Sequence, residues 1–225
     1  MCTSLPMELY YFPPSPPCRA VMLLARAIDA KLELRHVDLM AGEHLAVDFV
    51  KLNPQHTIPT FVEGDLILCE SRAILGYLVD RHAEDDSLYP QEPKRRARVN
   101  ARLYFDAGTL HQRLYDYMVP VVFRGQKPSE EQWKKVEEAF GFLDKFLEDD
   151  EWVAGDSITI ADYSIVVTTS NGEAFGLDLG KFPHVSRWYN KAKESMQDYE
   201  ELNQAGANQL GNLFRARVAE AENSV

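Results

Sequence analysis

The sequence predicts two structural units, an α/β unit at residues 1–84 and an all-helical unit at residues 94–225. Three observations support this fold class. Strand-like and helix-like patterns alternate over the first part of the chain. An acidic, proline-containing segment follows, which we interpret as a linker at residues 85–93. After this linker we find only helical periodicity, as expected for two domains of different architecture.

The first unit shows the order βαβα and then ββα. Aromatic or alternating residues mark its strands, and a Gly64-Asp65 turn marks a hairpin. The predicted elements are a strand at 8–12, a helix at 16–30, a strand at 32–39, a polar helix at about 43–51, hairpin strands at 60–63 and 66–69, and a helix at 71–83.

The second unit is predicted as a series of helices. They are placed at 95–124 (as one helix or two), 129–148, 159–175 and 185–196, followed by a short tail helix. Thr159 and Asp162 have the spacing of a capping box, and Ile158 and Tyr163 that of a hydrophobic staple. These signals fix the start of the most apolar helix, which we expect to form the core of this unit.

Net charge, cysteine count and hydropathy argue against several classes of function. The net charge is -11, with 24 basic and 35 acidic residues, and no basic face is available for nucleic acid. The cysteines Cys2, Cys18 and Cys69 are odd in number and lack CxxC spacing, which argues against a disulfide framework and for a reducing compartment. We find no signal-peptide pattern and no run long enough for a membrane span. We therefore expect a cytosolic protein with no nucleic-acid or membrane partner and no metal.

The stretch SPPCRA places Ser15 at the start of the first helix. Serine before Pro16 is a common helix start, so a cap without further role is one interpretation. Because Pro16 and Pro17 lack N–H groups, we expect the hydroxyl to cap the helix from Cys18 onward and to donate a hydrogen bond outward as well. GxSxG is absent, so a donor role is favoured over a nucleophile. Such a bond to a thiolate is worth about 1.5–3 kcal/mol, enough to lower a thiol pKa by roughly 1–2 units.

Two further segments suggest ligand contacts. In NPQHTIPTF, a cis bond before Pro59 would leave the main chain of Ile58 free to pair with a peptide-like ligand, while His56 is either a ligand contact or an ordinary loop histidine. In CESRAI, Ser71 is expected to cap a helix whose N–H groups attract a carboxylate. Glu70 could bind an ammonium and Arg72 a second carboxylate, although surface charges beside a cap are the alternative. A thiol, a peptide, a carboxylate and an amine together describe glutathione.

The chain resembles the cytosolic glutathione transferases, especially the insect delta and epsilon classes. The motifs are SPPCRAV, LMAGEHL, LNPQHTIPTF, ESRAIL, DDSLYP, RLYFDAGTL and VAGDSITIAD, in order from Tyr10 to about Trp188. AGEHL and LYFDAGTL favour the delta class. The resemblance implies a thioredoxin-like N-terminal domain (βαβαββα), an all-α C-terminal domain and a homodimer.

The resemblance also implies roles for individual residues. Ser15 would activate the glutathione thiol, with Pro17 beside it. The glutathione-binding residues would be Pro17, His44, His56, Thr57, Ile58, Pro59, Glu70, Ser71 and Arg72, joined at the γ-glutamyl end by Asp106 of the partner subunit. The hydrophobic second substrate would contact His111, Tyr115, Val119, Phe123 and Phe214. Ala107, His111 and Val119 are less bulky or less aromatic than expected for delta enzymes, which bears on substrate range.

The predicted activity is conjugation of the glutathione thiolate to small hydrophobic electrophiles, as in detoxification. Peroxidase or dehydrochlorinase side activities are hypotheses that rest on the family alone. A non-catalytic carrier of hydrophobic ligands in the same cleft is the main alternative. A disulfide-exchange enzyme acting through Cys18 is another, although Cys18 is better interpreted as a small buried filler.

Overall fold

The N-terminal unit contains a four-stranded sheet with the order β2-β1-β3-β4. The computed structural model describes residues 5–223, so Cys2, the start of the first predicted unit and the end of the second lie outside the described residues. Strand β1 runs parallel to β2 and antiparallel to β3, and β3 pairs antiparallel with β4. The elements are β1 (Met7–Tyr11), α1 (Pro16–Ala27), β2 (Leu32–His36), η1 (Glu43–Leu45), α2 (Val47–Leu52), β3 (Thr60–Glu63), β4 (Leu66–Leu68) and α3 (Ser71–His82).

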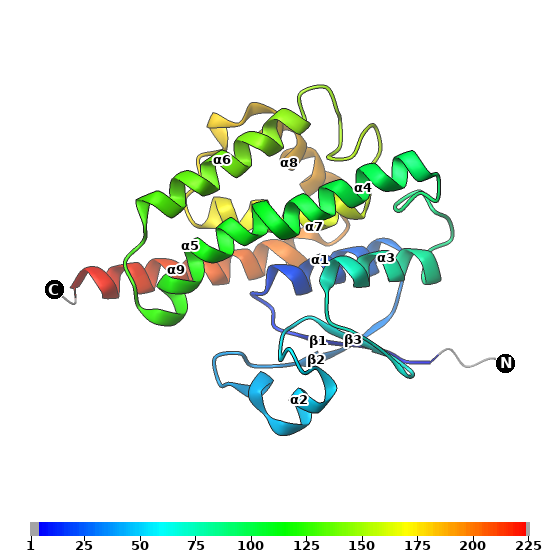
Figure 1. Ribbon diagram of the computed structural model, residues 1–225, viewed down its shortest axis with the longest axis horizontal. Coiled ribbons are helices and arrows are strands. Elements are labelled where there is room, and N and C mark those ends of the chain that lie inside the picture. The colour runs from blue at the N-terminus through cyan, green and yellow to red at the C-terminus, as the bar shows by residue number, and fades with distance from the viewer. Residues whose placement is uncertain (1–4, 224–225) are drawn as a thin grey trace.

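Helices lie on both faces of the sheet. Helices α1 and α3 cover the face toward the helical unit, and α2 lies on the opposite side (Figure 1). Leu9 and Phe61 pair across β1 and β3 and are fully buried in the core that α1 and α3 contribute to. On the other side, the ring of Tyr10 meets Phe49 of α2 at a centroid distance of 5.9 Å. This alternation follows from the period of two along a strand.

Several predicted ends are too long, and local turns explain why. Helix α1 ends at Ala27 because Asp29 adopts a left-handed φ of 53°. Strand β2 ends at His36, and the Asp38 carboxylate then accepts hydrogen bonds from the N–H groups of Met40 and Ala41. The polar helix predicted at 43–51 is two short helices, because Ala46 between them is extended.

Apart from one isolated bridge between Trp152 and Gly155, the regular elements of the C-terminal unit are all helices over the residues that the structure describes. Its elements are α4 (Pro93–Phe105), η2 (Asp106–Leu110), α5 (His111–Arg124), α6 (Glu130–Phe146), α7 (Ile160–Ala174), η3 (Leu179–Lys181), α8 (Pro183–Ser195), η4 (Glu200–Gln204) and α9 (Ala205–Asn223). The α/β and all-α fold class is therefore confirmed. Helices α4 and α5 form one long rod joined by the π-helical turn η2 (Figure 1).

Helix α7 forms the centre of this unit. Its residues are buried on all sides from Ile160 to Gly172, as predicted for the most apolar helix. The capping box at its start is present, and Asp162 Oδ2 accepts from the Thr159 N–H at 2.8 Å. The other oxygen, Oδ1, accepts from the Val153 N–H at 3.0 Å and from the Trp188 indole at 2.9 Å. One carboxylate therefore joins α7 to a loop and to α8.

The prediction of a short tail helix is wrong. Helix α9 has 19 residues and packs along α7 and α5. Leu210 and Phe214 are buried in this contact. The tail is therefore part of the folded core.

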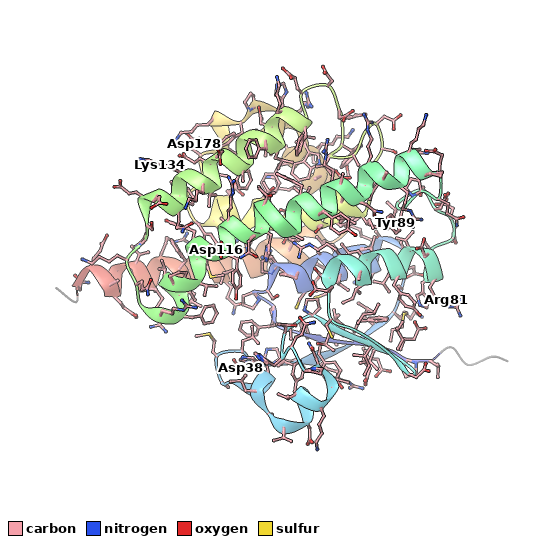
Figure 2. The ribbon with its side chains drawn as sticks, viewed as in Figure 1. Asp38, Arg81, Tyr89, Asp116, Lys134 and Asp178 are labelled. Atoms are coloured by element: carbon pink, nitrogen blue, oxygen red, sulfur yellow. The ribbon has the colours of Figure 1, made fainter. Side chains whose placement is uncertain are left out.

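The segment between the units is held by side chains. The guanidinium of Arg96 lies 3.3 Å from the centre of the Tyr89 ring and forms an ion pair with Asp80 of α3 at 3.0 Å. The Tyr89 hydroxyl donates to Asn100 on α4 at 2.8 Å. Figure 2 shows Tyr89 between the ends of α3 and α4, where it joins the two units.

Candidate active site

A cavity of about 440 Å³ lies where the two units meet. The N-terminal unit contributes Phe12, Pro14, Ser15, Pro16, Pro17, Leu39, His44, His56, Thr57 and Ile58. The helical unit contributes His111, Leu114, Tyr115, Met118, Val119, Phe123, Asn171, Phe175 and Leu210. Most of the residues predicted for the two substrates are therefore brought together, with polar groups concentrated on the N-terminal side.

Ser15 lies at the turn from β1 into α1. Its N–H donates to the Phe12 carbonyl at 2.9 Å, and its own carbonyl accepts the first helical bond, from Arg19, at 3.1 Å. The predicted side-chain cap is wrong, because the hydroxyl accepts no bond from the helix. Proline at the second helical position removes one of the two usual donors for such a cap. Ser15 is half-buried and lines the cavity.

The loop before β3 is built around Asn53, which is fully buried. Its amide nitrogen donates to the Thr57 carbonyl and the Thr60 hydroxyl, both at 2.9 Å. The Ile58-Pro59 bond is cis, as the motif suggested. Within residues 5–223 neither main-chain group of Ile58 has a hydrogen-bond partner, although Ile58 lines the cavity. A peptide-like ligand can therefore pair with both groups.

Two histidines lie at the same edge of the cavity. The rings of His44 and His56 are 6.2 Å apart between centroids. The Nδ1 atom of His44 is enclosed by protein yet has no hydrogen-bond partner in the described part of the chain. Since buried polar atoms are normally paired, this nitrogen is a candidate for contact with a ligand.

The segment Glu70 to Arg72 lies outside the cavity lining, at the start of α3. Glu70, not Ser71 as predicted, occupies the cap position. Its backbone is extended, and its carbonyl accepts the first helical hydrogen bond, from the Ile74 N–H at 2.9 Å. Ser71 is the first helical residue and is buried. Glu70 is exposed, and its carboxylate has no hydrogen-bond or ion-pair partner among the described residues.

Asp106 was predicted to reach a partner subunit's site. Asp106 is fully buried and accepts from Arg72 Nη2 at 2.6 Å within its own chain. The hydroxyls of Ser164 and Thr168 on α7 donate to it at 2.6 and 3.0 Å. A role for Asp106 at a partner subunit's site stays a prediction, since these three donors within its own chain already hold the carboxylate. The carboxylate fixes Arg72, which also donates to the Ser71 hydroxyl at 3.3 Å.

The helical side of the cavity differs in part from the prediction. Phe214 does not line it, and its ring packs behind Phe175 at a centroid distance of 4.8 Å. Leu114 and Met118 also line the cavity and were not predicted, although they continue the face of α5 that begins at His111. Asn171 was not predicted either, and its signal was a polar residue inside the otherwise apolar α7.

Comparisons with known proteins match both units. The models "Glutathione S-transferase, N-terminal domain" and "Glutathione S-transferase, C-terminal domain" match residues 5–80 and 104–195. Glutathione S-transferase D7 of Anopheles gambiae is 46% identical over 212 residues, which cover 93% of this chain and 97% of that protein. The chain belongs to the glutathione S-transferase family. The resemblance inferred from the motifs is thereby confirmed, and the chain is a glutathione transferase, an enzyme of a family that uses glutathione as co-substrate.

Solved glutathione transferases have the same fold. A delta-class enzyme of Nilaparvata lugens is 46% identical with a TM-score of 0.91, covering 94% of this chain and 100% of that one. An epsilon-class enzyme of the housefly, Musca domestica, is 42% identical with a TM-score of 0.89, covering 94% and 98%. The similarity thus extends to both insect classes named by the motifs.

The thiol of Cys18 is poorly placed for disulfide exchange in this transferase. Its residue is fully buried in the first turn of α1. Burial raises the pKa of the Cys18 thiol to about 11, against the opposing effect of the Ser15 hydroxyl. Because the thiolate is the reactive form, this environment favours the interpretation of Cys18 as a filler.

Between Leu5 and Asn223, no group of three His, Cys, Asp or Glu side chains is arranged to hold a metal ion. Within that same range, none of the helices combines the length and the apolar character needed to cross a membrane.

Proposed function

We propose that this transferase joins the glutathione thiolate to small hydrophobic electrophiles, with Ser15 as the group that keeps the thiol ionised. The observation that carries this proposal is the position of Ser15, which lines the cavity at the start of α1 and whose hydroxyl makes no capping bond. A hydroxyl that donates to a thiolate lowers the thiol pKa and so raises the fraction of nucleophile at neutral pH.

We assign the cysteinyl part of glutathione to Ile58, which lines the cavity and whose main-chain groups have no hydrogen-bond partner in the described part of the chain. The glycine end is assigned to His44 and His56, with Thr57 in the same loop. The γ-glutamyl end is assigned to Glu70, Ser71 and Arg72. In this arrangement Asp106 orients Arg72 from within the same subunit, because their ion pair is buried on the Asp106 side.

The electrophile would occupy the helical side of the cavity, against Tyr115, Val119, Phe123 and Phe175. These side chains are largely apolar, which suits small hydrophobic compounds. A shared cavity that presents both a thiol-activating group and an apolar wall favours catalysis over a carrier role.

A homodimer in the cytosol is part of the proposal. The large side chains of Leu5, Ile67 and Tyr104 are exposed by 59%, 41% and 77%. Ile67 lies on β4, one of the two edge strands of the sheet, and Tyr104 lies on α4. A second copy would cover such apolar surface, and sedimentation equilibrium would give the mass of the assembly.

Ser15→Ala tests the proposed role of the hydroxyl. We expect kcat/KM for a simple electrophile to fall by about 10- to 100-fold near neutral pH, because the lost bond is worth about 1.5–3 kcal/mol. Glutathione should still bind, since its other contacts remain. The difference in kcat/KM between Ser15→Ala and wild type should become smaller as pH rises through the pKa of the free glutathione thiol, because the thiol then ionises without help from the enzyme.

The matched control is Ser157→Ala, an intermediate-exposure serine outside the cavity whose hydroxyl accepts from Arg95. It should leave conjugation and the thiolate absorbance of bound glutathione unchanged. If Ser15→Ala kept most of its kcat, or if the bound thiol titrated as in wild type, Ser15 would have no such role.

A further inference from the structure

Two polar groups stand out on the helical side of the cavity. Most of the residues there are apolar, but Asn171 on α7 and His111 at the start of α5 are not. Their hydrogen-bonding groups indicate that this side of the cavity recognises something more than apolar surface.

The orientation of the Asn171 amide is fixed by Arg19. Asn171 Oδ1 accepts a hydrogen bond from Arg19 Nη2. Since a guanidinium has donors only, the amide oxygen must face Arg19 and the amide nitrogen must face away from it. Among the described residues this nitrogen has no partner, yet protein atoms do not enclose it. Because Asn171 is 98% covered and lines the cavity, its N–H groups open into the cavity.

Arg19 is itself held rigidly at the junction of α1, α7 and η4. It is 1% exposed, and its Nη1 donates to the Asn203 carbonyl at 3.0 Å and the Ser170 hydroxyl at 3.4 Å. Within residues 5–223 no carboxylate forms an ion pair with it. Its uncompensated charge polarises the amide that it contacts, which strengthens the amide as a donor. Arg19 is therefore a positioning residue for Asn171.

His111 faces the same space. It follows the π-helical turn η2 and lines the cavity. Neither ring nitrogen has a hydrogen-bond partner in the described chain, and neither is enclosed. Burial lowers the pKa of His111 to about 4, and the charges of Arg72 and Arg19 act in the same direction, whereas Asp106 opposes them. At neutral pH the ring is therefore uncharged, with one donor and one acceptor nitrogen.

We propose that Asn171 and His111 form a polar subsite that donates hydrogen bonds to an oxygen atom of the electrophile. It selects α,β-unsaturated carbonyl compounds over alkyl halides of similar size. This inference rests on the proposed conjugation function. It assigns a specificity that the apolar wall alone would not produce, because apolar contact does not distinguish a carbonyl from a halide.

The chemistry of such a substrate places charge where the subsite can stabilise it. The thiol proton leaves to water when the thiolate forms. The sulfur then bonds to the β-carbon, the carbon–carbon π pair shifts, and negative charge develops on the carbonyl oxygen. The α-carbon finally takes a proton from water. In a halide displacement the charge leaves with the halide, so donors aimed at an oxygen give little help.

The test compares two aryl-bearing electrophiles, cinnamaldehyde and benzyl chloride, with the full chain and saturating glutathione. We expect Asn171→Asp and His111→Phe each to lower the ratio of kcat/KM for cinnamaldehyde to that for benzyl chloride by about tenfold, the effect of one hydrogen bond to developing charge. Asn171→Asp keeps an oxygen for Arg19, so the fold is preserved while the donor is lost. His111→Gln, which retains a donor, should recover most of the ratio.

Gln112→Leu is the matched control, because Gln112 is the next residue of α5 but is exposed and bonded to Asp116. It should leave the ratio unchanged. The carbonyl stretching frequency of cinnamaldehyde bound beside S-methylglutathione gives a readout without turnover, and it should rise in both subsite variants. Equal losses for the two substrates with an unchanged frequency would overturn the subsite. A wild-type enzyme that conjugated neither compound, with the frequency still shifted, would instead refute the proposed function.

Discussion

Asp106 brings a negative charge into the interior, where none of its side chain is exposed. Its partners are Arg72 and the hydroxyls of Ser164 and Thr168. We predict that Asp106→Ala lowers the free energy of unfolding by about 3–5 kcal/mol, because it leaves the Arg72 cation without its counter-charge and two buried hydroxyls without an acceptor. Urea unfolding at fixed protein concentration would measure this loss.

Asp48→Ala is the control for Asp106→Ala. Asp48 pairs with Lys51 at 3.1 Å, but its side chain is 96% exposed. Such a surface pair contributes little, so this change should stay within about 0.5 kcal/mol of wild type. Comparable losses in the two variants would show that burial of the Asp106 pair does not matter.

The sequence indicated residues whose chemistry is local and missed those whose role depends on packing. Ser15 and Ile58 could be predicted because Pro16, Pro17 and Pro59 restrict the backbone beside them. The intrasubunit role of Asp106 could not, since its partners lie 34 to 62 residues away along the chain. For the same reason the link from Arg19 to Asn171, across 152 residues, had no sequence signature.

At the scale of single elements, the start of α7 is held by one buried carboxylate, that of Asp162, which accepts from three residues. We predict that Asp162→Ala lowers the free energy of unfolding by roughly 3 kcal/mol or more, because Val153, Thr159 and Trp188 all lose an acceptor in a buried place. Ser129→Ala, at the start of α6, removes the Ser129 hydroxyl, which accepts from the Gln132 N–H at 3.3 Å near solvent. That change should cost about 1 kcal/mol.

Thermal and urea unfolding of both variants would check this difference. If Asp162→Ala cost no more than Ser129→Ala, the carboxylate would be an ordinary helix cap rather than a joint between α7, α8 and the preceding loop. The capping box itself was visible in the sequence. The contact with Trp188 was not, because a capping motif carries no information about which distant helix packs on it.

At the scale of the whole molecule, the active-site cavity depends on how α1 meets η4, α7 and α9. Sequence periodicity predicted two units, but it could not predict this junction. Short-range patterns describe which face of a helix is apolar, whereas the junction combines an apolar face with the buried cation of Arg19. Figure 1 shows α1 lying directly against the helical unit, with α9 passing beside it.

Gly206 in the first turn of α9 lies close to the turn before α1 at this junction. A methyl group there would collide with the Pro13 carbonyl oxygen and would lie 2.7 Å from Arg19 Cδ. We predict that Gly206→Ala pushes α9 away from the turn that carries Ser15, lowering stability by about 1–3 kcal/mol and reducing kcat as well.

Gly141→Ala in α6 is the control. A methyl group at Gly141 meets nothing within 4 Å, so this change should stabilise the protein by about 0.5–1 kcal/mol through helix propensity alone. Melting temperatures and conjugation rates of the two variants separate a steric effect at the junction from a general effect of glycine replacement. Equal shifts of the same sign would mean that the junction tolerates the methyl group and does not set the geometry of the cavity.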